Sequence, residues 1–535
     1  MTADTQPRHA RLDQSPVTGV GTLLALAVRR DRIRLSVWIA ALTLTMVYAP
    51  NAVKLAYPDE AARAARVNLL KTPAGIMLGG PFFGGNETDL GAMMANELML
   101  SLIAAASILS ILTIVRHTRA EEESGTSELV MSSVVGRHAR TLAALALVGA
   151  VNAILAVTMT LALAVTGFDL IDCAGMCFGV TAVSMLFGAV AAVTVQLWRQ
   201  GRTATGAAMG ALASAVVIRG VGDIIDHSGS ALSWLSPIAW AQQMRSFVDL
   251  RWWPFALLIA VTVALIGLSM LLESRREYDD GILPSRGDRV NAPPVRGAFG
   301  LNLVLLRGQV IGWGVGLLLA GLAFGSMTTS LQDAAKSNEL LARVLATQGY
   351  DGIYTTLTQF LAAATTGFVV SAILRLHHDE QSGIAEEVLA GSISRWRWLL
   401  SNVGATLAAA AVLMTLAGLG IGIGAAATIG DAGLIPKLTA AGIAHTPAMA
   451  VIAGIAALAV ALRQPLIGWL AVTFVVLSLY LGALLRLPRW LIDLSPVGRT
   501  TVPANMPWEA MAVMVAVAVA LTALAGVIFR HRDAV

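Results

Sequence analysis

Apolar runs of roughly 20 residues recur along the whole of this chain, and they limit the folds that it can adopt. A run of that length can cross the hydrocarbon core of a bilayer as an α-helix. Because lipid offers no partner to free backbone groups, a membrane-spanning segment must be a helix or part of a closed barrel. Barrel strands alternate polar and apolar residues, and these runs do not. The sequence therefore predicts an all-α polytopic membrane protein.

The composition agrees with this class of protein. Hydrophobic residues make up 56% of the chain and charged residues 13%, whereas charged residues are about 25% of an average soluble domain. The mean hydropathy is +0.72. The net charge of +4 requires no nucleic-acid partner, because anionic lipid headgroups attract basic residues near a membrane.

We predict about twelve transmembrane helices, arranged as two fused six-helix halves. The first six runs lie near residues 35–53, 92–115, 141–166, 173–198, 204–222 and 252–272. The second six lie near residues 309–327, 353–374, 398–429, 446–462, 465–485 and 508–529. The resulting parts are a cytoplasmic N-terminus with an amphipathic connecting helix (1–34), the first half (35–272), a cytoplasmic linker (273–300) and the second half (301–535).

Two acidic loops repeat the same pattern 258 positions apart, one in each half. The residues of the first loop that recur are Glu122, Ser124, Gly125, Glu128 and Arg137, and their counterparts are Glu380, Ser382, Gly383, Glu386 and Arg395. A second echo, Leu235-Ser236-Pro237 against Leu494-Ser495-Pro496, falls at a shift of 259. The chain is therefore predicted to be a tandem duplication of one membrane unit.

The arginines predict the orientation. With both termini in the cytoplasm, the inner loops hold most of them, as the positive-inside rule requires. Exceptions are Arg486, Arg489 and Arg499, which fall near the last outer segment.

The chain contains two cysteines, Cys173 and Cys177, at the start of one apolar run. On a helix, they could bind a metal with outside help or form a strained disulfide. We favour a role as small packing residues and predict no metal site, since two ligands fall short of a structural zinc site.

The acidic loops offer a surface rather than a catalytic pair. Residues seven apart on a helix point in nearly the same direction, so Glu121 and Glu128 share a face, as do Asp379 and Glu386. A solvated carboxylate has no burial to raise its pKa, so no catalytic residue is expected. Either loop alone would fit a plain solvated charge run. Their repetition favours docking onto two copies of one partner.

The acidic residues, Ser-Gly, further Glu and basic residue between the second and third runs resemble the coupling-helix region of ABC-2 type exporter permeases. The fused six-helix halves resemble bacterial permeases of the tetronasin-resistance or multidrug-exporter type. This resemblance implies an ABC-2 (type V exporter-like) fold in the bacterial cell membrane and export of hydrophobic or amphipathic compounds such as antibiotics. It also implies two copies of a separate ATPase, which would bind ATP and Mg.

Carried over by position, the resemblance gives each ATPase copy one set of docking residues. The first set is Glu121, Glu122, Ser124, Gly125, Glu128 and Arg137, and the second is Asp379, Glu380, Ser382, Gly383, Glu386 and Arg395. The loops differ at Leu129, where the second has Glu387, so the two copies need not be held equally.

No phosphate-binding loop is visible in this sequence. Such a loop needs Gly-x4-Gly-Lys-Ser/Thr, and none of the four lysines, Lys54, Lys71, Lys336 and Lys437, follows that frame. We therefore expect no cofactor in this chain. We expect it to be a transport subunit rather than an enzyme. If ATP is used, another polypeptide must hydrolyse it.

Candidates for the cargo pathway are Met93, Glu97, Met99, Phe360, Phe368, Trp469, Phe474 and Tyr480. An acidic group within a membrane is costly and suggests function, so Glu97 could meet a cationic cargo. It could also pair with a residue such as Arg219, or lie at the outer interface. For the aromatic residues the alternative is packing in the core or against lipid.

An alternative function is a proton-coupled secondary drug transporter, with Glu97 as the proton carrier and Asp223 or Asp226 as relay. The counterpart of Glu97 in the second half is Thr355, which weakens this alternative. Residues 234–250 and 490–508, rich in Trp and Pro, are predicted to be short re-entrant helices at the outer side, or else interfacial anchors.

Overall fold

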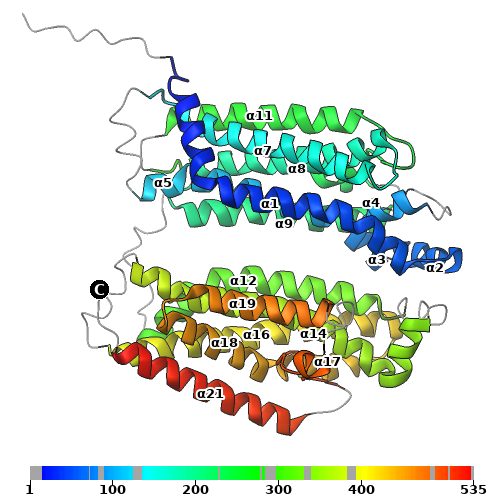
Figure 1. Cartoon of the computed structure of the whole chain (residues 1–535), viewed down its shortest axis with the longest axis vertical. Helices are drawn as coiled ribbons and strands as arrows, with labels where there is room; N and C mark the ends of the chain where they lie inside the picture. Colours follow the sequence, from blue (N-terminus) through cyan, green and yellow to red (C-terminus); the bar gives the residue numbers. More distant parts are fainter. Residues whose placement is uncertain are drawn as a thin grey trace, which may run out of the picture. The chain divides into compact units, whose positions relative to one another are not determined.

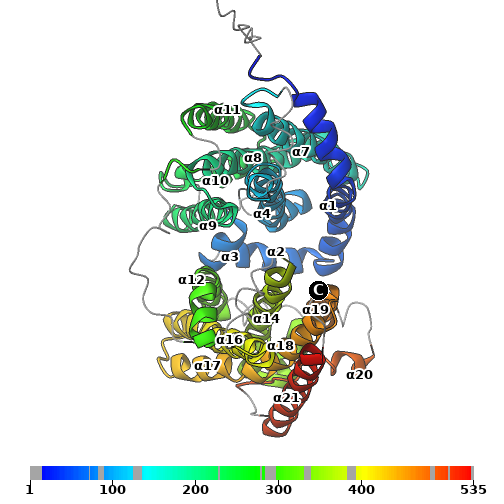
Figure 2. The ribbon, with the colours of Figure 1, turned by 90° about the vertical axis from the view of Figure 1, so that its left-hand side faces the viewer.

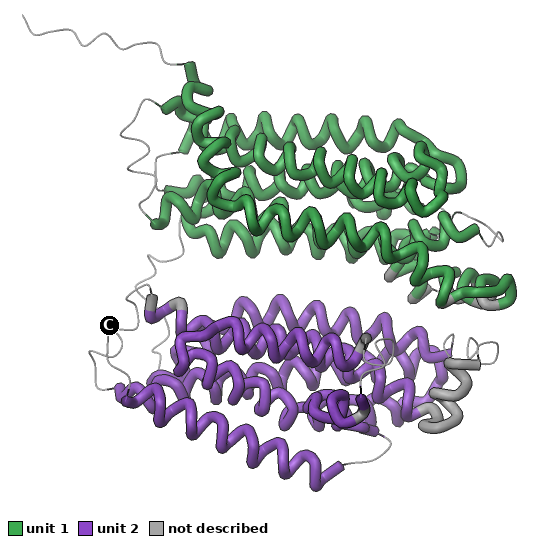
Figure 3. The backbone as a smooth tube through the Cα atoms, in the orientation of Figure 1, with its two compact units in different colours: residues 1–289 green, residues 290–535 purple. Residues whose placement is uncertain are grey.

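The computed structural model describes a helical protein in two compact units, Met1–Arg289 and Val290–Val535 (Figure 3). The described residues are 15–71, 73–81, 83, 89–124, 135–226, 229–276, 280–283, 297–329, 339–381, 393–481, 488–503 and 507–531. These residues form helices, turns and loops, and none of them forms a strand. The predicted all-α polytopic fold is confirmed.

Unit 1 is a bundle of long helices joined by short ones (Figure 1). The long helices are α1 (Val20–Ala56), α4 (Leu90–Arg116), α7 (Ala139–Ala164), α8 (Leu170–Leu197), α9 (Gly201–Ile225) and α11 (Trp253–Arg275). The short elements are α2 (Glu60–Leu70), α3 (Pro73–Gly79), α5 (Arg119–Glu123), the 3-10 turn η1 (Ser233–Leu235) and α10 (Pro237–Gln242).

Unit 2 has a similar order of elements. Its long helices are α12 (Gly297–Ser326), α14 (Glu339–Gln381), α16 (Arg395–Ile429), α18 (Thr446–Ala461) and α21 (Trp508–His531). The shorter ones are α17 (Leu434–Ile443), α19 (Pro465–Val476), the π-helical turn η3 (Leu477–Leu481) and α20 (Arg489–Ile492).

Eleven segments of the described chain are long and apolar enough to cross a membrane, one fewer than the sequence predicts. The remaining predicted run, near 465–485, contains the shorter apolar helix Pro465–Leu479, and residues 482–487 lie outside the described residues. The helix changes to π geometry at Leu477–Leu481, so its regular α-helical part stops early. The predicted count of about twelve spans agrees with eleven long spans and one shorter apolar helix among the described residues.

Both units repeat one arrangement of neighbours. In unit 1, α8 packs against α4, α7, α9 and α11, and in unit 2, α18 packs against α14, α16, α19 and α21 (Figure 2). Helix α1 packs on α7 as α12 packs on α16. A tandem duplication predicts this correspondence, because equal helices bury equal faces.

The buried interior of unit 1 includes Cys173 and Cys177 on α8, both as free thiols. They belong to the same apolar cluster as Met99 and Phe187. The interpretation of the cysteines as packing residues is confirmed.

The connecting helix expected before the first span is continuous with that span. Helix α1 runs unbroken from Val20 to Ala56, and Figure 1 shows its first turns bending away from the rest. Arginines and leucines are good helix formers, so nothing between Gly21 and Pro50 interrupts the hydrogen-bond ladder. Because the connecting segment and the first span form one helix, a movement of the start of α1 would also move the first span.

Candidate functional site

The first acidic loop begins with a short helix, α5, at the end of unit 1 where α9 starts and α11 ends (Figure 1). Helix α5 carries three consecutive glutamates, Glu121, Glu122 and Glu123. Residues 125–134 follow and lie outside the described residues, so Gly125 and Glu128 are not located. We call α5 and the charged side chains that bind its glutamates the glutamate cluster: Glu121, Glu122, Glu123, Arg30, His117, Arg119, Arg140 and Arg276.

Each of the three glutamates binds a different part of the bundle. Glu121 accepts from Arg30 of α1 at 3.0 Å and lies 3.3 Å from His117 at the end of α4. Glu123 accepts at 2.7 Å from the backbone N–H of Gly201, the first residue of α9. A carboxylate at a helix N-terminus is favoured by the free N–H groups and the helix dipole. The α5 helix is therefore fastened to both α1 and α9.

Glu122 occupies the centre of the glutamate cluster. Arg276 donates to both of its oxygens, at 2.7 and 3.1 Å, and Arg119 and Arg140 bind it as well. The side chain of Glu122 is 2% exposed. Paired arginine–carboxylate bonds of this kind are the stronger hydrogen bonds of proteins. Glu122 therefore links α5 to α7 and to the end of α11.

The sequence predicted a solvated carboxylate at this position, and that expectation is wrong for Glu122. Three guanidinium groups compensate its charge, which allows the carboxylate to leave water. A side chain so deeply buried offers no contact surface to another protein, so any role of Glu122 in docking is indirect. Ser124 caps the end of α5, where its hydroxyl donates to the carbonyl oxygen of Glu121 at 3.2 Å.

The far side of the loop attaches to the end of α11. Arg137 donates at 2.6 Å to the carbonyl oxygen of Ser274. His138 Nδ1 donates to Glu273 Oε2 at 2.7 Å, and the hydroxyl of Thr141 donates to Glu273 Oε1, also at 2.7 Å. Arg137, which the resemblance places in the docking set, thus also holds the loop to the bundle.

A buried polar joint connects the first two long helices of each unit. In unit 1, Asp31 of α1 binds His117 at 3.0 Å and Arg116 at 3.1 Å. In unit 2, Asn302 of α12 accepts at 2.6 Å from Arg375 of α14, and Arg375 stands 258 positions after His117. Neither joint was predicted from the sequence, although a polar residue in the amphipathic part of each first helix was a visible signal.

The second acidic loop is described only at its borders. Asp379 and Glu380 lie in the last turn of α14, and Asp379 is 3.8 Å from Arg375. Arg395 is the first residue of α16. Ser382, Gly383 and Glu386 lie outside the described residues, so the docking surface predicted for them remains a prediction.

Glu97 lies toward the opposite end of unit 1, and its partner is not the one expected. Arg66 Nε donates to Glu97 Oε1 at 2.6 Å, and the hydroxyl of Tyr57 also binds this carboxylate. Burial raises the pKa of Tyr57 to about 12; Arg66 lowers the pKa of Tyr57, and Glu97 raises it. Glu97 is therefore already neutralised by an internal cation.

Arg219, named as a possible partner of Glu97, is buried elsewhere. It donates to the carbonyl oxygens of Ile76, at 3.2 Å, and Met77 in α3, and it lies 3.5 Å from Asp223. Asp223 also accepts from Ser233 at 2.5 Å. Glu97 and Asp223 are thus served by different arginines, which gives no support to a shared proton relay.

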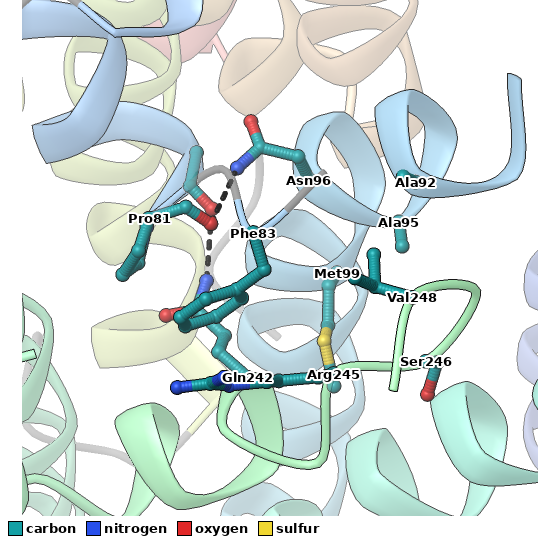
Figure 4. A pocket seen from close by; sticks show the side chains of 11 residues that line it. Pro81, Phe83, Ala92, Ala95, Asn96, Met99, Gln242, Arg245, Ser246 and Val248 are labelled. Atoms are coloured by element: carbon teal, nitrogen blue, oxygen red, sulfur yellow. Dashed lines mark hydrogen bonds between the residues drawn. The ribbon is translucent and has the colours of Figure 1, made fainter. Parts of the chain in front are cut away.

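A small cavity of about 40 Å³ lies near the same end of unit 1 (Figure 4). Met99 lines it, and the amide of Asn96 donates to the carbonyl oxygens of Gly80 and Pro81 at 3.0 and 3.2 Å. The guanidinium of Arg245 lies 4.5 Å from the ring centre of Phe83. Drug-sized ligands need roughly 300 Å³ or more, so this cavity is too small to hold a cargo molecule.

The remaining pathway candidates are dispersed. Met93 and Phe368 are fully buried, and Phe368 packs edge-on against Trp313 with 6.3 Å between ring centres. Phe360 and Phe474 are half-buried, whereas Trp469 is 46% exposed on α19. The side chain of Tyr480 lies outside the described residues. The described residues thus bring no group of these aromatics together around a cavity.

The predicted re-entrant segment at 234–250 contains two short helical elements, η1 and α10. Ile238 and Met244 are fully buried, and α10 packs against α4, α8, α9 and α11. In unit 2 the corresponding segment holds the four-residue helix α20, followed by turns and irregular chain as far as Pro503. Short helical elements are therefore present in both places, and their re-entrant course at the outer side stays a prediction.

Comparison with known proteins adds the following. A family model described as "Multidrug efflux system permease Rv1217c, C-terminal domain" matches residues 295–530. The chain is 35% identical over 541 residues to "Multidrug efflux system permease protein Rv1217c" of Mycobacterium tuberculosis (strain ATCC 25618 / H37Rv). That alignment covers 97% of this chain and 96% of the relative. The similarity therefore extends over both units.

Proposed function

The chain belongs to the family of multidrug efflux permeases, and from this premise we propose that it is the membrane-spanning subunit of an ATP-driven exporter. Its cargo in this proposal is hydrophobic or amphipathic compounds, antibiotics among them. Two copies of a separate ATPase dock on it, one at the loop around residues 121–128 and the other at the loop around 379–386. Each ATPase copy binds ATP and Mg.

The glutamate cluster is the observation that carries this proposal. The loop that repeats in both halves begins, in unit 1, with a helix whose glutamates bind α1, α7, α9 and α11. A loop that only keeps the protein soluble has no need of such anchoring. A loop that receives force from a partner does, since displacement of a loosely attached loop would not move the helices.

The sequence supports a separate source of energy. None of the four lysines of this chain lies in a phosphate-binding frame. Transport in this scheme follows a two-state movement, in which closure of the ATPase pair tilts the helix bundles as rigid bodies. Helices with close-packed interiors switch between discrete arrangements rather than deform continuously.

We place the protein in the bacterial cell membrane, with the glutamate cluster and both termini in the cytoplasm. The support is the positive-inside rule, because Arg30, Arg119, Arg140 and Arg276 gather at one end of unit 1. The opposite end, with Glu97 and α10, then faces outward.

The proton-coupled alternative has less support. Its proton carrier would be Glu97, which already has a cationic partner in Arg66 and a hydrogen bond from Tyr57. Protonation of Glu97 would leave the charge of Arg66 without a partner, and a half-buried unpaired charge is costly.

Docking is tested with charge reversal. Glu128→Arg together with Glu386→Arg should abolish co-purification with the phosphate-loop ATPase that we expect to be encoded in the neighbouring reading frame. Single reversals should have unequal effects because of Glu387 in the second loop. The matched control is Glu509→Arg, an exposed glutamate in the first turn of α21. A complex that survives both reversals would refute the docking assignment.

A further inference from the structure

The chain before residues 125–134 and the chain after them both bind the last turn of α11. Before the segment, Glu122 binds Arg276 through two hydrogen bonds of 2.7 and 3.1 Å. After it, His138 and Thr141 each bind Glu273 at 2.7 Å. Arg276 and Glu273 are three positions apart and end the last helix of unit 1. The residues on either side of the segment are thus attached to the same end of α11.

These contacts with α11 are better shielded from water than the contact of α5 with Arg30 of α1. The side chains of Glu273 and Arg276 are 5% and 6% exposed, whereas Arg30, the partner of Glu121, is 50% exposed. Exposed ion pairs contribute little because water and salt screen them, and shielded pairs resist separation more strongly. The connection to α11 should therefore outlast the connection of α5 to α1 when the loop is displaced.

The chain just beyond α11 is also attached. Arg119 of α5 donates to the carbonyl oxygens of Val195, at 2.9 Å, and Asp280. The backbone N–H of Leu283 donates at 2.9 Å to the carbonyl oxygen of Leu197, at the end of α8. The end of α11 is therefore attached, directly or through the chain that follows it, to α5, α7 and α8.

We propose that α11 is the helix to which unit 1 transmits movement of its coupling segment, with Glu122, Glu273 and Arg276 as positioning residues. A displacement of residues 125–134 acts on α11 through two shielded attachments on the same turn, so the helix follows as one body. This inference rests on the proposed function, because it names the path by which that loop would act. It assigns no contact with ATP or cargo to these residues.

The experiment measures ATP hydrolysis and cargo transport separately, with the complete permease–ATPase complex in liposomes. Arg276→Gln and Glu273→Gln each remove one attachment. We expect normal assembly and ATP hydrolysis, but at least about fivefold less transport per ATP hydrolysed, at the low end of usual coupling energies. The matched control is Arg251→Gln, which breaks the exposed Arg251–Asp249 pair outside the glutamate cluster. Unchanged transport per ATP in both test variants would overturn the inference.

A covalent rescue separates transmission from damage to the fold. His138→Cys with Glu273→Cys removes the second attachment, and a short bis-thiol cross-linker then restores a link at the same place. Cys173 and Cys177 are buried and should not interfere. Transport per ATP should fall before cross-linking and recover after it. An assembled, cross-linked complex that remains uncoupled would contradict the inference, whereas a wild-type complex without ATP-driven transport would refute the proposed function itself.

Discussion

In unit 2, the indole ring of Trp396 lies directly against Gly526 of α21, where even a single added methyl group would overlap the ring. Trp396 stands 258 positions after His138, and His138 attaches the start of α7 to the end of α11. The duplicated units therefore join corresponding helices, α7 to α11 and α16 to α21, through side chains at the same position of the repeat, His138 and Trp396. The joint is ionic in unit 1 and an aromatic ring against glycine in unit 2.

Replacing Gly526 with alanine should destabilise the joint between α16 and α21. The added methyl group has no space beside Trp396, and overpacking of this kind costs about 1–3 kcal/mol. We expect a lower midpoint of thermal unfolding for the purified permease in detergent. The control is Gly312→Ala on α12, where an added methyl group would meet nothing within 4 Å. Equal stability of the two variants would show that Trp396 is free to move away.

Glu97→Gln should affect all cargo alike rather than cationic cargo alone. Because Arg66 already neutralises Glu97, loss of this charge leaves a mostly shielded arginine without its partner, at a cost of about 1–3 kcal/mol. We expect efflux of cationic and of neutral dyes to fall by similar factors in whole cells. The double variant Arg66→Gln/Glu97→Gln should recover much of this loss, because neither charge remains.

The opposite pattern would restore the hypothesis that Glu97 recognises cations. Under that hypothesis, Glu97→Gln would impair export of cationic dyes only, and the double variant would not recover it. The two dyes should be of similar size, so that only their charge differs.

The positions of the helices could be predicted because lipid imposes a strict rule on apolar runs. The run near 204–222 corresponds to α9 at Gly201–Ile225, and the run near 398–429 to α16 at Arg395–Ile429. The run near 465–485 corresponds to α19 and η3, but apolar composition does not register the change from α to π geometry at Leu477. Hydropathy also could not show that α1 continues through its arginines. Arginine is a good helix former, but it lowers the hydropathy and so looks like the end of a span.

The partners of charged residues could not be predicted, because pairing depends on the packing of distant segments. Glu122 looks like part of a solvated acidic run, but Arg140 and Arg276 reach it from 18 and 154 positions away. Arg66 of α2 reaches Glu97 of α4 because the chain folds back between these helices, and no local sequence pattern predicts that fold. The number of arginines at the predicted inner ends was the one available signal, since a buried glutamate needs such partners.

The most direct test of the central claim is ATP-driven drug transport in inside-out membrane vesicles that contain the permease and its ATPase, with an uncoupler present to abolish the proton gradient. An ATP-driven exporter should accumulate drug in these vesicles when ATP and Mg are added, and a non-hydrolysable ATP analogue should not support accumulation. Transport that continues without a proton gradient is the result that our account predicts. Transport that needs the gradient and ignores ATP would contradict it.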